Sequence, residues 1–252
     1  MDRTRLRGAL MVLALWSALA APAAAQHVAS TDDDIQARVE SRLFDEGLAG
    51  VRVDVRQRTV ALSGEVESLW QQDRAIRQAR KVRDVALVVS GLTISRGASD
   101  AAIAREIATD VTESSRFSIF DDVNVRVAGG EATLTGYVTT DSKSEEFTTV
   151  TSNVPGVQKI VNQIETLPAS MTDDDLRDAL AIAIYRHPMF APYALQRVGP
   201  IHIIVRHGHV TLTGVVATGA EKWMAGMLTQ GTSGVVDCDN KVHVSEQSGP
   251  VM

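Results

Sequence analysis

The sequence predicts an α+β protein built from three tandem α-β-β-α-β modules, each a small three-stranded sheet with two helices on one face. Two observations carry this prediction. Stretches that alternate apolar and polar residues end in a glycine three times, at Gly64, Gly136 and Gly214. A valine then follows each glycine at the same distance in all three copies, at Val85, Val157 and Val235. The modules are expected over residues 31–96, 99–167 and 172–245.

Each module is expected to begin with a capped amphipathic helix. Thr31, Ser99 and Thr172 are candidate N-caps, and the acidic residues after them suit the positive end of a helix dipole. Apolar residues then recur every four positions, which places them on one helical face. These series are Ile35, Val39 and Leu43; Ile103, Ile107 and Val111; and Leu176, Leu180 and Ile184.

A β-hairpin is expected after each first helix. Its turn is Gln57-Arg58, Gly129-Gly130 or His207-Gly208, of which the last two suit a tight two-residue turn. Counting outward from these turns places the apolar strand residues on one face of each hairpin. A second helix is then expected over 68–82, 141–154 and 218–230, and a final strand over 85–94, 157–167 and 235–244.

Residues 1–25 read as a secretory signal peptide. Three arginines precede a short apolar run, and the small residues Ala23, Ala24 and Ala25 follow. The alternative is a membrane anchor, but the run is shorter than the roughly 20 residues that span a bilayer. We therefore expect cleavage before Gln26 and export to the periplasm.

The composition excludes several classes of protein. Apolar residues make up 44% and charged residues 22%, which suits a soluble globular chain and excludes a disordered or multi-span membrane protein. One cysteine excludes an internal disulfide framework and a cysteine-based metal centre. The formal net charge is −6, and removal of the leader arginines makes it more negative. Nucleic acid is therefore not expected as a partner.

Short motifs repeat within the modules and resemble one known family. They are Val60–Val66 (VALSGEV), Ala132–Val138 (ATLTGYV) and Val210–Val216 (VTLTGVV), with VPGV at 154–157 and IVN at 160–162. Together they resemble the BON domain of bacterial osmotically inducible periplasmic proteins, over about residues 31–244. The resemblance implies an exported, non-catalytic module without a cofactor, associated with envelope stress, phospholipid surfaces or chaperone-like contacts.

The first copy departs from this pattern at two positions. Asp84 stands where the other copies have Gly156 and Gly234, so an altered turn into the last strand is expected there. Ser90 stands where the others have Asn162 and Asn240. The third copy differs in another way, because the link between its first helix and its hairpin is longer.

The second helix of the first copy is the candidate lipid-binding surface. Basic residues beside a tryptophan suit an anionic lipid surface, although an ordinary solvated helix face remains the alternative. The candidate residues are Trp70, Arg74, Arg77, Arg80 and Lys81.

Other chemistry-bearing residues favour structural roles. The motif glycines Gly64, Gly136, Gly214, Gly156 and Gly234 suit close packing rather than ligand approach. His202, His207 and His209 invite a metal hypothesis, but their spacing argues against one shared ion, and no metal or other cofactor is predicted. Cys238 aligns with apolar residues and is expected to behave as a small buried one.

The three copies repeat no catalytic constellation, so an enzyme is not expected. The basic helix favours a protein that associates peripherally with anionic phospholipid, and the resemblance implies a cell-envelope binding protein linked to envelope or osmotic stress. The alternative is an adaptor or chaperone-like protein that contacts envelope proteins through exposed sheet edges or through the apolar link 185–200.

Overall fold

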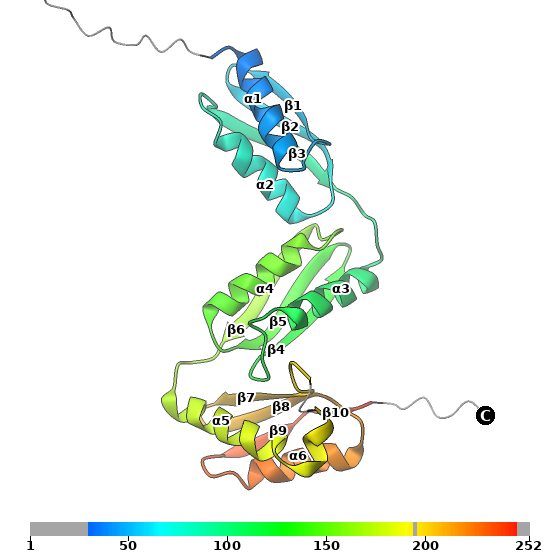
Figure 1. Ribbon diagram of the computed structural model, residues 1–252, viewed down its shortest axis with the longest axis vertical. Coiled ribbons are helices and arrows are strands. Elements are labelled where there is room, and N and C mark those ends of the chain that lie inside the picture. The colour runs from blue at the N-terminus through cyan, green and yellow to red at the C-terminus, as the bar shows by residue number, and fades with distance from the viewer. Residues whose placement is uncertain (1–29, 194–195, 246–252) are drawn as a thin grey trace, which may run out of the picture.

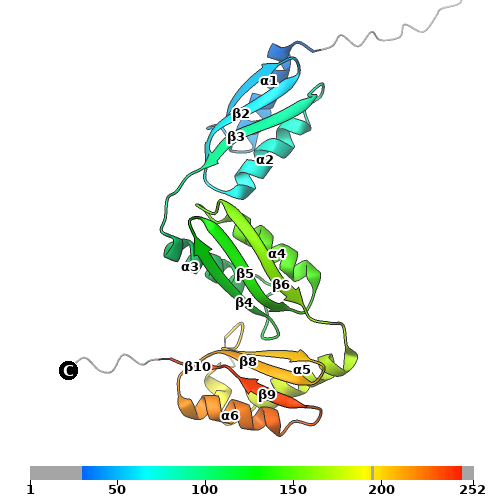
Figure 2. The same ribbon diagram turned by 180° about the vertical axis from the view of Figure 1, so that it is seen from behind.

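The computed structural model describes residues 30–193 and 196–245 and arranges them as three α-β-β-α-β modules along the long axis of the molecule (Figure 1). Each module has its own cluster of buried apolar residues. The helices cover one face of each sheet, and the strands come to the front in the view from behind (Figure 2). The predicted α+β class and threefold repetition are confirmed. The predicted signal peptide, residues 1–25, lies outside the described residues.

The first module consists of α1 (Asp32–Asp45), β1 (Arg52–Arg56), β2 (Thr59–Val66), α2 (Leu69–Arg80) and β3 (Leu87–Ile94). β2 is the central strand, with β1 antiparallel on one side and β3 parallel on the other. Because parallel neighbours need a crossover connection, α2 carries the chain back between β2 and β3.

The second module repeats this topology with α3 (Asp100–Glu113), β4 (Asp122–Ala128), β5 (Glu131–Val138), α4 (Asp141–Asn153) and β6 (Lys159–Thr166). The apolar series expected on the first helices are buried in all three modules. The helix face that was inferred from spacing is therefore the face that covers the sheet.

The third module is more elaborate than expected. It consists of α5 (Met171–Tyr185), the 3-10 helix η1 (Pro188–Tyr193), β7 (Ile201–Arg206), β8 (His209–Val216), α6 (Gly219–Gln230), β9 (Asp237–Asn240) and β10 (His243–Val244). The single final strand expected over 235–244 is wrong, because β9 and β10 pair with β8 as separate pieces. Between them Val242 is fully buried, and its N–H donates to the side-chain oxygen of Asn240 at 3.2 Å.

The helix starts follow the capping prediction in two modules. The Thr31 hydroxyl accepts from the N–H of Asp34, whose carboxylate accepts in return from the N–H of Thr31. Ser99 caps α3 through the N–H of Ala102. The third prediction is wrong, because α5 begins earlier and Ser170, not Thr172, is its N-cap. The Ser170 hydroxyl accepts from the N–H of Asp173 at 3.2 Å, so the preceding turn joins the helix.

Neighbouring modules touch through different surfaces. Between the first two, the N–H of Gly156 donates to the carbonyl of Glu67 at 2.9 Å, and Leu69 packs against the core of the second module. Between the last two, the N–H of Ile203 donates to the carbonyl of Ile119 at 2.7 Å. The second module thereby covers the outer edge of β7.

Candidate functional site

The structure divides the predicted lipid-binding residues into two groups. Trp70 and Arg74 form the first, and they interact within the module. The Arg74 guanidinium lies 4.4 Å from the centre of the Trp70 ring and forms an ion pair with Glu46, at the end of α1. The side chains of this ion pair are partly buried, with 33% of Arg74 and 22% of Glu46 exposed. Arg74 therefore ties α2 to the end of α1, and its charge is engaged within the module.

The remaining members, Arg77, Arg80 and Lys81, are exposed on the last turn of α2 and just beyond it. Arg77 lies 3.8 Å from Asp73 one turn away, which is a loose surface contact. These three cations thus face solvent, as a surface that attracts anions requires.

The structure adds two arginines that the sequence analysis did not include. Arg38 and Arg42 lie one turn apart on the exposed side of α1. Together with Lys81 and Arg83 they surround a shallow hollow of about 320 Å³, which also contains Asp45. We call Arg38, Arg42, Lys81 and Arg83 the basic cluster. The spacing of Arg38 and Arg42 is visible in the sequence, but their approach to the end of α2 depends on how the two helices pack.

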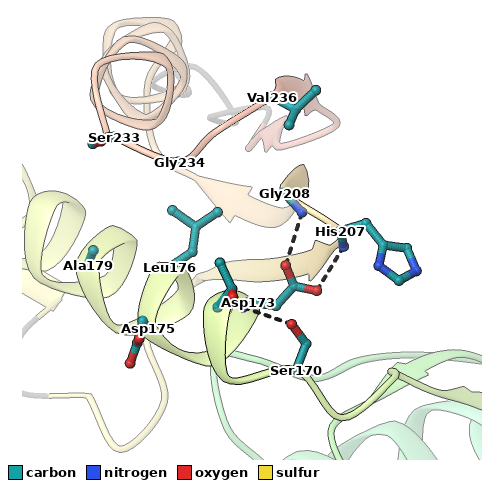
Figure 3. Close-up of a pocket in the computed structure, with 11 residues that line it drawn as sticks. Ser170, Asp173, Asp175, Leu176, Ala179, His207, Gly208, Ser233, Gly234 and Val236 are labelled. Atoms are coloured by element: carbon teal, nitrogen blue, oxygen red, sulfur yellow. Dashed lines mark hydrogen bonds between the residues drawn. The ribbon is translucent and has the colours of Figure 1, made fainter.

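A larger pocket lies in the third module, and its residue Asp173 has a structural role (Figure 3). Its volume is about 640 Å³, and Asp173 extends from the start of α5 toward the hairpin turn. The Asp173 carboxylate accepts from the N–H of His207 at 2.8 Å and from the N–H of Gly208 at 3.0 Å. Both oxygens of this buried carboxylate are therefore engaged by backbone N–H groups, which ties the start of α5 to the hairpin turn.

The same bond pair recurs in every module. Asp32 accepts from the N–H groups of Gln57 and Arg58, and Asp100 accepts from those of Gly129 and Gly130. All six turn residues have positive φ, and because they lie beyond the last pair of each ladder their N–H groups have no partner strand. An aspartate in the first helical turn supplies the missing acceptors. This bond also explains how Gln57 and Arg58 occupy a turn that favours glycine.

The glycines that end the central motifs lie where the backbone leaves no space. A β-carbon at Gly136 or Gly214 would lie 2.0 Å from the carbonyl oxygen of Asp122 or Pro200, and at Gly64 it would lie 3.0 Å from that of Gly50. Each glycine also has φ above +100°. At Gly156 the β-carbon would lie 2.9 Å from the Ile103 side chain, whereas at Gly234 the nearest atom is at an ordinary distance.

The expectation of an altered turn at Asp84 is wrong. Asp84 has φ +68°, the same left-handed conformation as Gly156 and Gly234. Its carboxylate accepts from the Ser30 hydroxyl at 2.7 Å, and its carbonyl accepts from Arg58 Nε at 2.8 Å. Aspartate tolerates positive φ better than most residues, and these bonds hold it there.

The asparagine of the IVN motif ties the last strand to the second helix. Asn162 donates to the Ser144 hydroxyl at 2.8 Å, and Asn240 donates to the carbonyl of Lys222 at 2.8 Å. In the first module Ser90 is too short for this contact. Gln72 of α2 instead donates to the carbonyl of Leu92 at 3.0 Å, so the helix provides the link.

The three histidines of the third hairpin lie apart. His202 packs against Phe117 of the second module, with ring centres 5.5 Å apart, and burial lowers its pKa while Asp122 and Asp121 oppose that shift. His209 lies 2.8 Å from Asp237, and His207 occupies the turn. Within the described ranges, no three His, Cys, Asp or Glu side chains lie close enough to hold a metal ion.

Cys238 is half-buried, and its thiol resists ionisation. Burial raises the pKa of this thiol, and the neighbouring Asp239 and Asp237 raise it further. The thiolate is the reactive form, so this environment disfavours nucleophilic chemistry.

The described part of the chain, 30–193 and 196–245, contains no helix that is long and apolar enough to cross a membrane.

Structural comparison gives weak similarities only. The C-terminal domain of CdsD, described as the structural protein of the type III secretion system of Chlamydia trachomatis, is 14% identical, with 86% of this chain and 100% of that chain covered at a TM-score of 0.25. The PrgH periplasmic domain is 13% identical, with 80% and 99% covered at a TM-score of 0.23. Similarity at this level supports no argument about arrangement or function. A search of curated proteins gives no significant match.

The family comparison is decisive. The model of the BON domain matches three times, over residues 31–96, 99–168 and 173–246. These matches coincide with the three modules of the structure. They support an envelope-associated protein of a generally non-catalytic family. The chain belongs to the BON-domain family and carries three tandem BON domains.

Proposed function

We propose that this protein is a non-catalytic, exported binding protein whose first module docks peripherally on an anionic phospholipid surface. The observation that carries the proposal is the basic cluster, in which Arg38 and Arg42 of α1 meet Lys81 and Arg83 around one hollow. Phosphate groups of lipid headgroups are the anions that such a surface would meet in a cell envelope.

The electrostatic contribution of the basic cluster is large enough for binding at low and moderate salt. Each basic residue near an anionic membrane contributes on the order of 1 kcal/mol. Asp45, within the hollow, offsets part of this attraction, and the net charge of the chain, −6 with the leader and more negative without it, opposes approach at long range. Charges are screened beyond about 10 Å at 0.1 M salt, so the cluster acts locally while the distant acidic residues contribute little.

The internal pairing of Trp70 and Arg74 refines this proposal. An interfacial tryptophan would add apolar insertion to the charge attraction. Because the Trp70 ring lies beneath Arg74, we expect docking that is mainly electrostatic, without deep insertion of a side chain. Such binding is strongly dependent on ionic strength.

Vesicle co-sedimentation of the chain that begins at Gln26 tests the proposal. We expect it to bind vesicles that contain phosphatidylglycerol at low salt and to be released as salt rises. The triple variant Arg38→Ser, Arg42→Ser, Lys81→Ser should lose most of this binding. A matched control is Arg105→Ser, Arg126→Ser, Lys241→Ser, which removes three exposed cations from the other modules. Equal binding by the two variants would contradict the proposal.

The link to envelope or osmotic stress and the periplasmic location are part of the same proposal, and membership of the BON-domain family supports them. N-terminal sequencing of the exported protein tests the location, with Gln26 as the expected first residue. A second candidate function, contact with envelope proteins, is favoured by the open edge of the first sheet, where β1 is the outer strand.

A further inference from the structure

The space between the first helix and the first strand is filled in the second and third modules and open in the first. In the second module Phe117, from the link 114–121, fills it and is 6% exposed. In the third module Phe190, from the link 186–200, fills it and is fully buried. Both aromatic side chains join the core of their own module.

The first module has a shorter link and a smaller side chain at this place. The link 46–51 supplies Leu48, which is buried but leaves a groove of about 670 Å³ between α1 and β1. Ala37 and Phe44 line the helix side of the groove, and Val51 and Val53 line the strand side. Phe44 is 69% exposed, which is unusual for a phenylalanine beside an apolar groove.

The strand beside this groove also has unpaired backbone. β1 is the outer strand of its sheet, and its two-residue turn fixes which residues bond to β2. Because bonded and non-bonded pairs alternate along an antiparallel ladder, the N–H and C=O groups of Val53 and Val55 point away from β2. An apolar groove and a free strand edge therefore lie side by side.

The third module shows what such an edge binds. Ile203 occupies in β7 the position that Val53 occupies in β1, since each pairs with the leucine two residues before the motif glycine. The N–H of Ile203 donates to the carbonyl of Ile119 in the second module. Ile119 and Phe120 pack against the core of the third module at the same time. The turn over residues 118–121, which the bond from the N–H of Asp121 to the carbonyl of Ser118 closes, thus combines one edge bond with apolar side chains.

We propose that the groove and the edge of β1 bind a turn of a partner protein that carries a bulky apolar side chain, aromatic or branched, beside the edge-bonding carbonyl. A backbone bond to the strand edge fixes the position of the turn, and the groove selects its side chain, as in other recognition at an exposed sheet edge. The proposal goes beyond lipid docking, because Ala37 and Phe44 line this groove whereas Arg38 and Arg42 surround the hollow toward α2.

The surroundings favour a protein segment over a lipid or a second copy. A lipid chain offers no acceptor to the edge N–H groups, and the charged residues of the groove, Glu40 and Arg52, are of opposite sign. In a second copy, the one segment seen to make this kind of contact, with Ile119 and Phe120, already packs on β7 of that copy.

The test uses a fluorescent peptide with the sequence of residues 114–122 and the full chain from Gln26. We expect saturable binding by fluorescence anisotropy, with the amide signals of Val53 and Val55 shifted in NMR spectra. Phe44→Ser should weaken binding about 10-fold, as loss of an aromatic contact at an interface does. Ala37→Glu, at an exposed helical position, should weaken it as well. Trp223→Ser removes a similarly exposed aromatic residue from the third module and should leave binding unchanged.

Three results would overturn the proposal. The first is absence of saturable binding, or equal binding by Phe44→Ser and Trp223→Ser. The second is a dimer of the free chain that Phe44→Ser dissociates, which would make a second copy the occupant. The third is vesicle binding that Ala37→Glu abolishes, which would make a lipid chain the occupant. Failure of the lipid proposal is separate, because that proposal depends on the basic cluster and not on these residues.

Discussion

A β-carbon at Gly136 would meet the carbonyl oxygen of Asp122 at 2.0 Å, whereas one at Gly129 would meet nothing within 4 Å. Both glycines have positive φ, yet only Gly136 lies against backbone that cannot move aside. The repeated motif glycine is therefore required because a side chain has no room where the central strand passes the start of the first strand. Its repetition was visible in the sequence, but the contact that requires it was not.

This difference predicts unequal effects of two substitutions. Gly136→Ala should destabilise the second module by more than about 3 kcal/mol, because a left-handed backbone and a collision with a carbonyl add together. Gly129→Ala should destabilise it by only about 1–2 kcal/mol, the usual effect of positive φ on alanine. Hydrogen exchange along β4 and β5 would measure both. Comparable loss of protection in the two variants would mean that the close contact is not decisive.

At the level of single elements, the sequence predicted most of what local chemistry determines. Apolar spacing identified the buried helix faces, and alternation identified the hairpins, because both follow from the geometry of the regular backbone. The start of α5 at Ser170 and the break between β9 and β10 were missed. The helix start depends on the bond from the N–H of Asp173 to the Ser170 hydroxyl, and the strand break depends on the bond from the N–H of Val242 to the Asn240 side chain. Other polar side chains close by in the sequence are equally able to form such bonds, so the sequence does not single these two out.

The bond between helix and hairpin turn gives an element-scale prediction. Asp173→Ala would leave the N–H groups of His207 and Gly208 without their acceptor in a buried place. We expect a loss of about 2–3 kcal/mol in the stability of the third module. Asp175→Ala, two residues along the same helix and exposed, should change stability by less than about 0.5 kcal/mol. Urea denaturation combined with exchange at the Gly208 amide would decide, and similar curves for the two variants would contradict the role of Asp173.

At the scale of the whole molecule, the arrangement of the modules was beyond sequence reasoning. The repeat predicts that the modules are alike, whereas their contacts depend on residues that are not repeated, such as Ile119 in the link 114–121. Asp121 shapes that link, since its fully buried carboxylate accepts from the N–H of Ser118 at 2.9 Å and from Lys143 Nζ at 2.7 Å. Of the basic cluster, the sequence analysis included only Lys81, because the cluster forms through the packing of α1 against α2.

The contact between the second and third modules should depend on pH. Burial lowers the pKa of His202 below its ordinary value of 6.5, so the docked state prefers the neutral ring. The undocked ring binds more protons below about pH 6.5, and docking therefore weakens as pH falls through that value. Asp121 and Asp122 face this ring and reduce the effect.

Small-angle scattering at pH 7.5 and pH 5 would detect this loosening as an increase in the radius of gyration. His202→Gln keeps a neutral side chain at both pH values and should remove most of the pH dependence. A radius that increases equally in this variant would assign the effect to other groups.

The central claim, that the basic cluster of the first module faces the lipid surface, is tested most directly by a fluorophore placed beside it. In a Cys238→Ser background, an environment-sensitive probe is attached at Ser41→Cys, next to Arg42, or at Thr109→Cys, the corresponding exposed position of the second module. Vesicles that contain phosphatidylglycerol should shift the emission of the Ser41 probe to shorter wavelength at low salt, while the Thr109 probe stays unchanged. Equal shifts at both positions, or a shift at Thr109 alone, would contradict the claim.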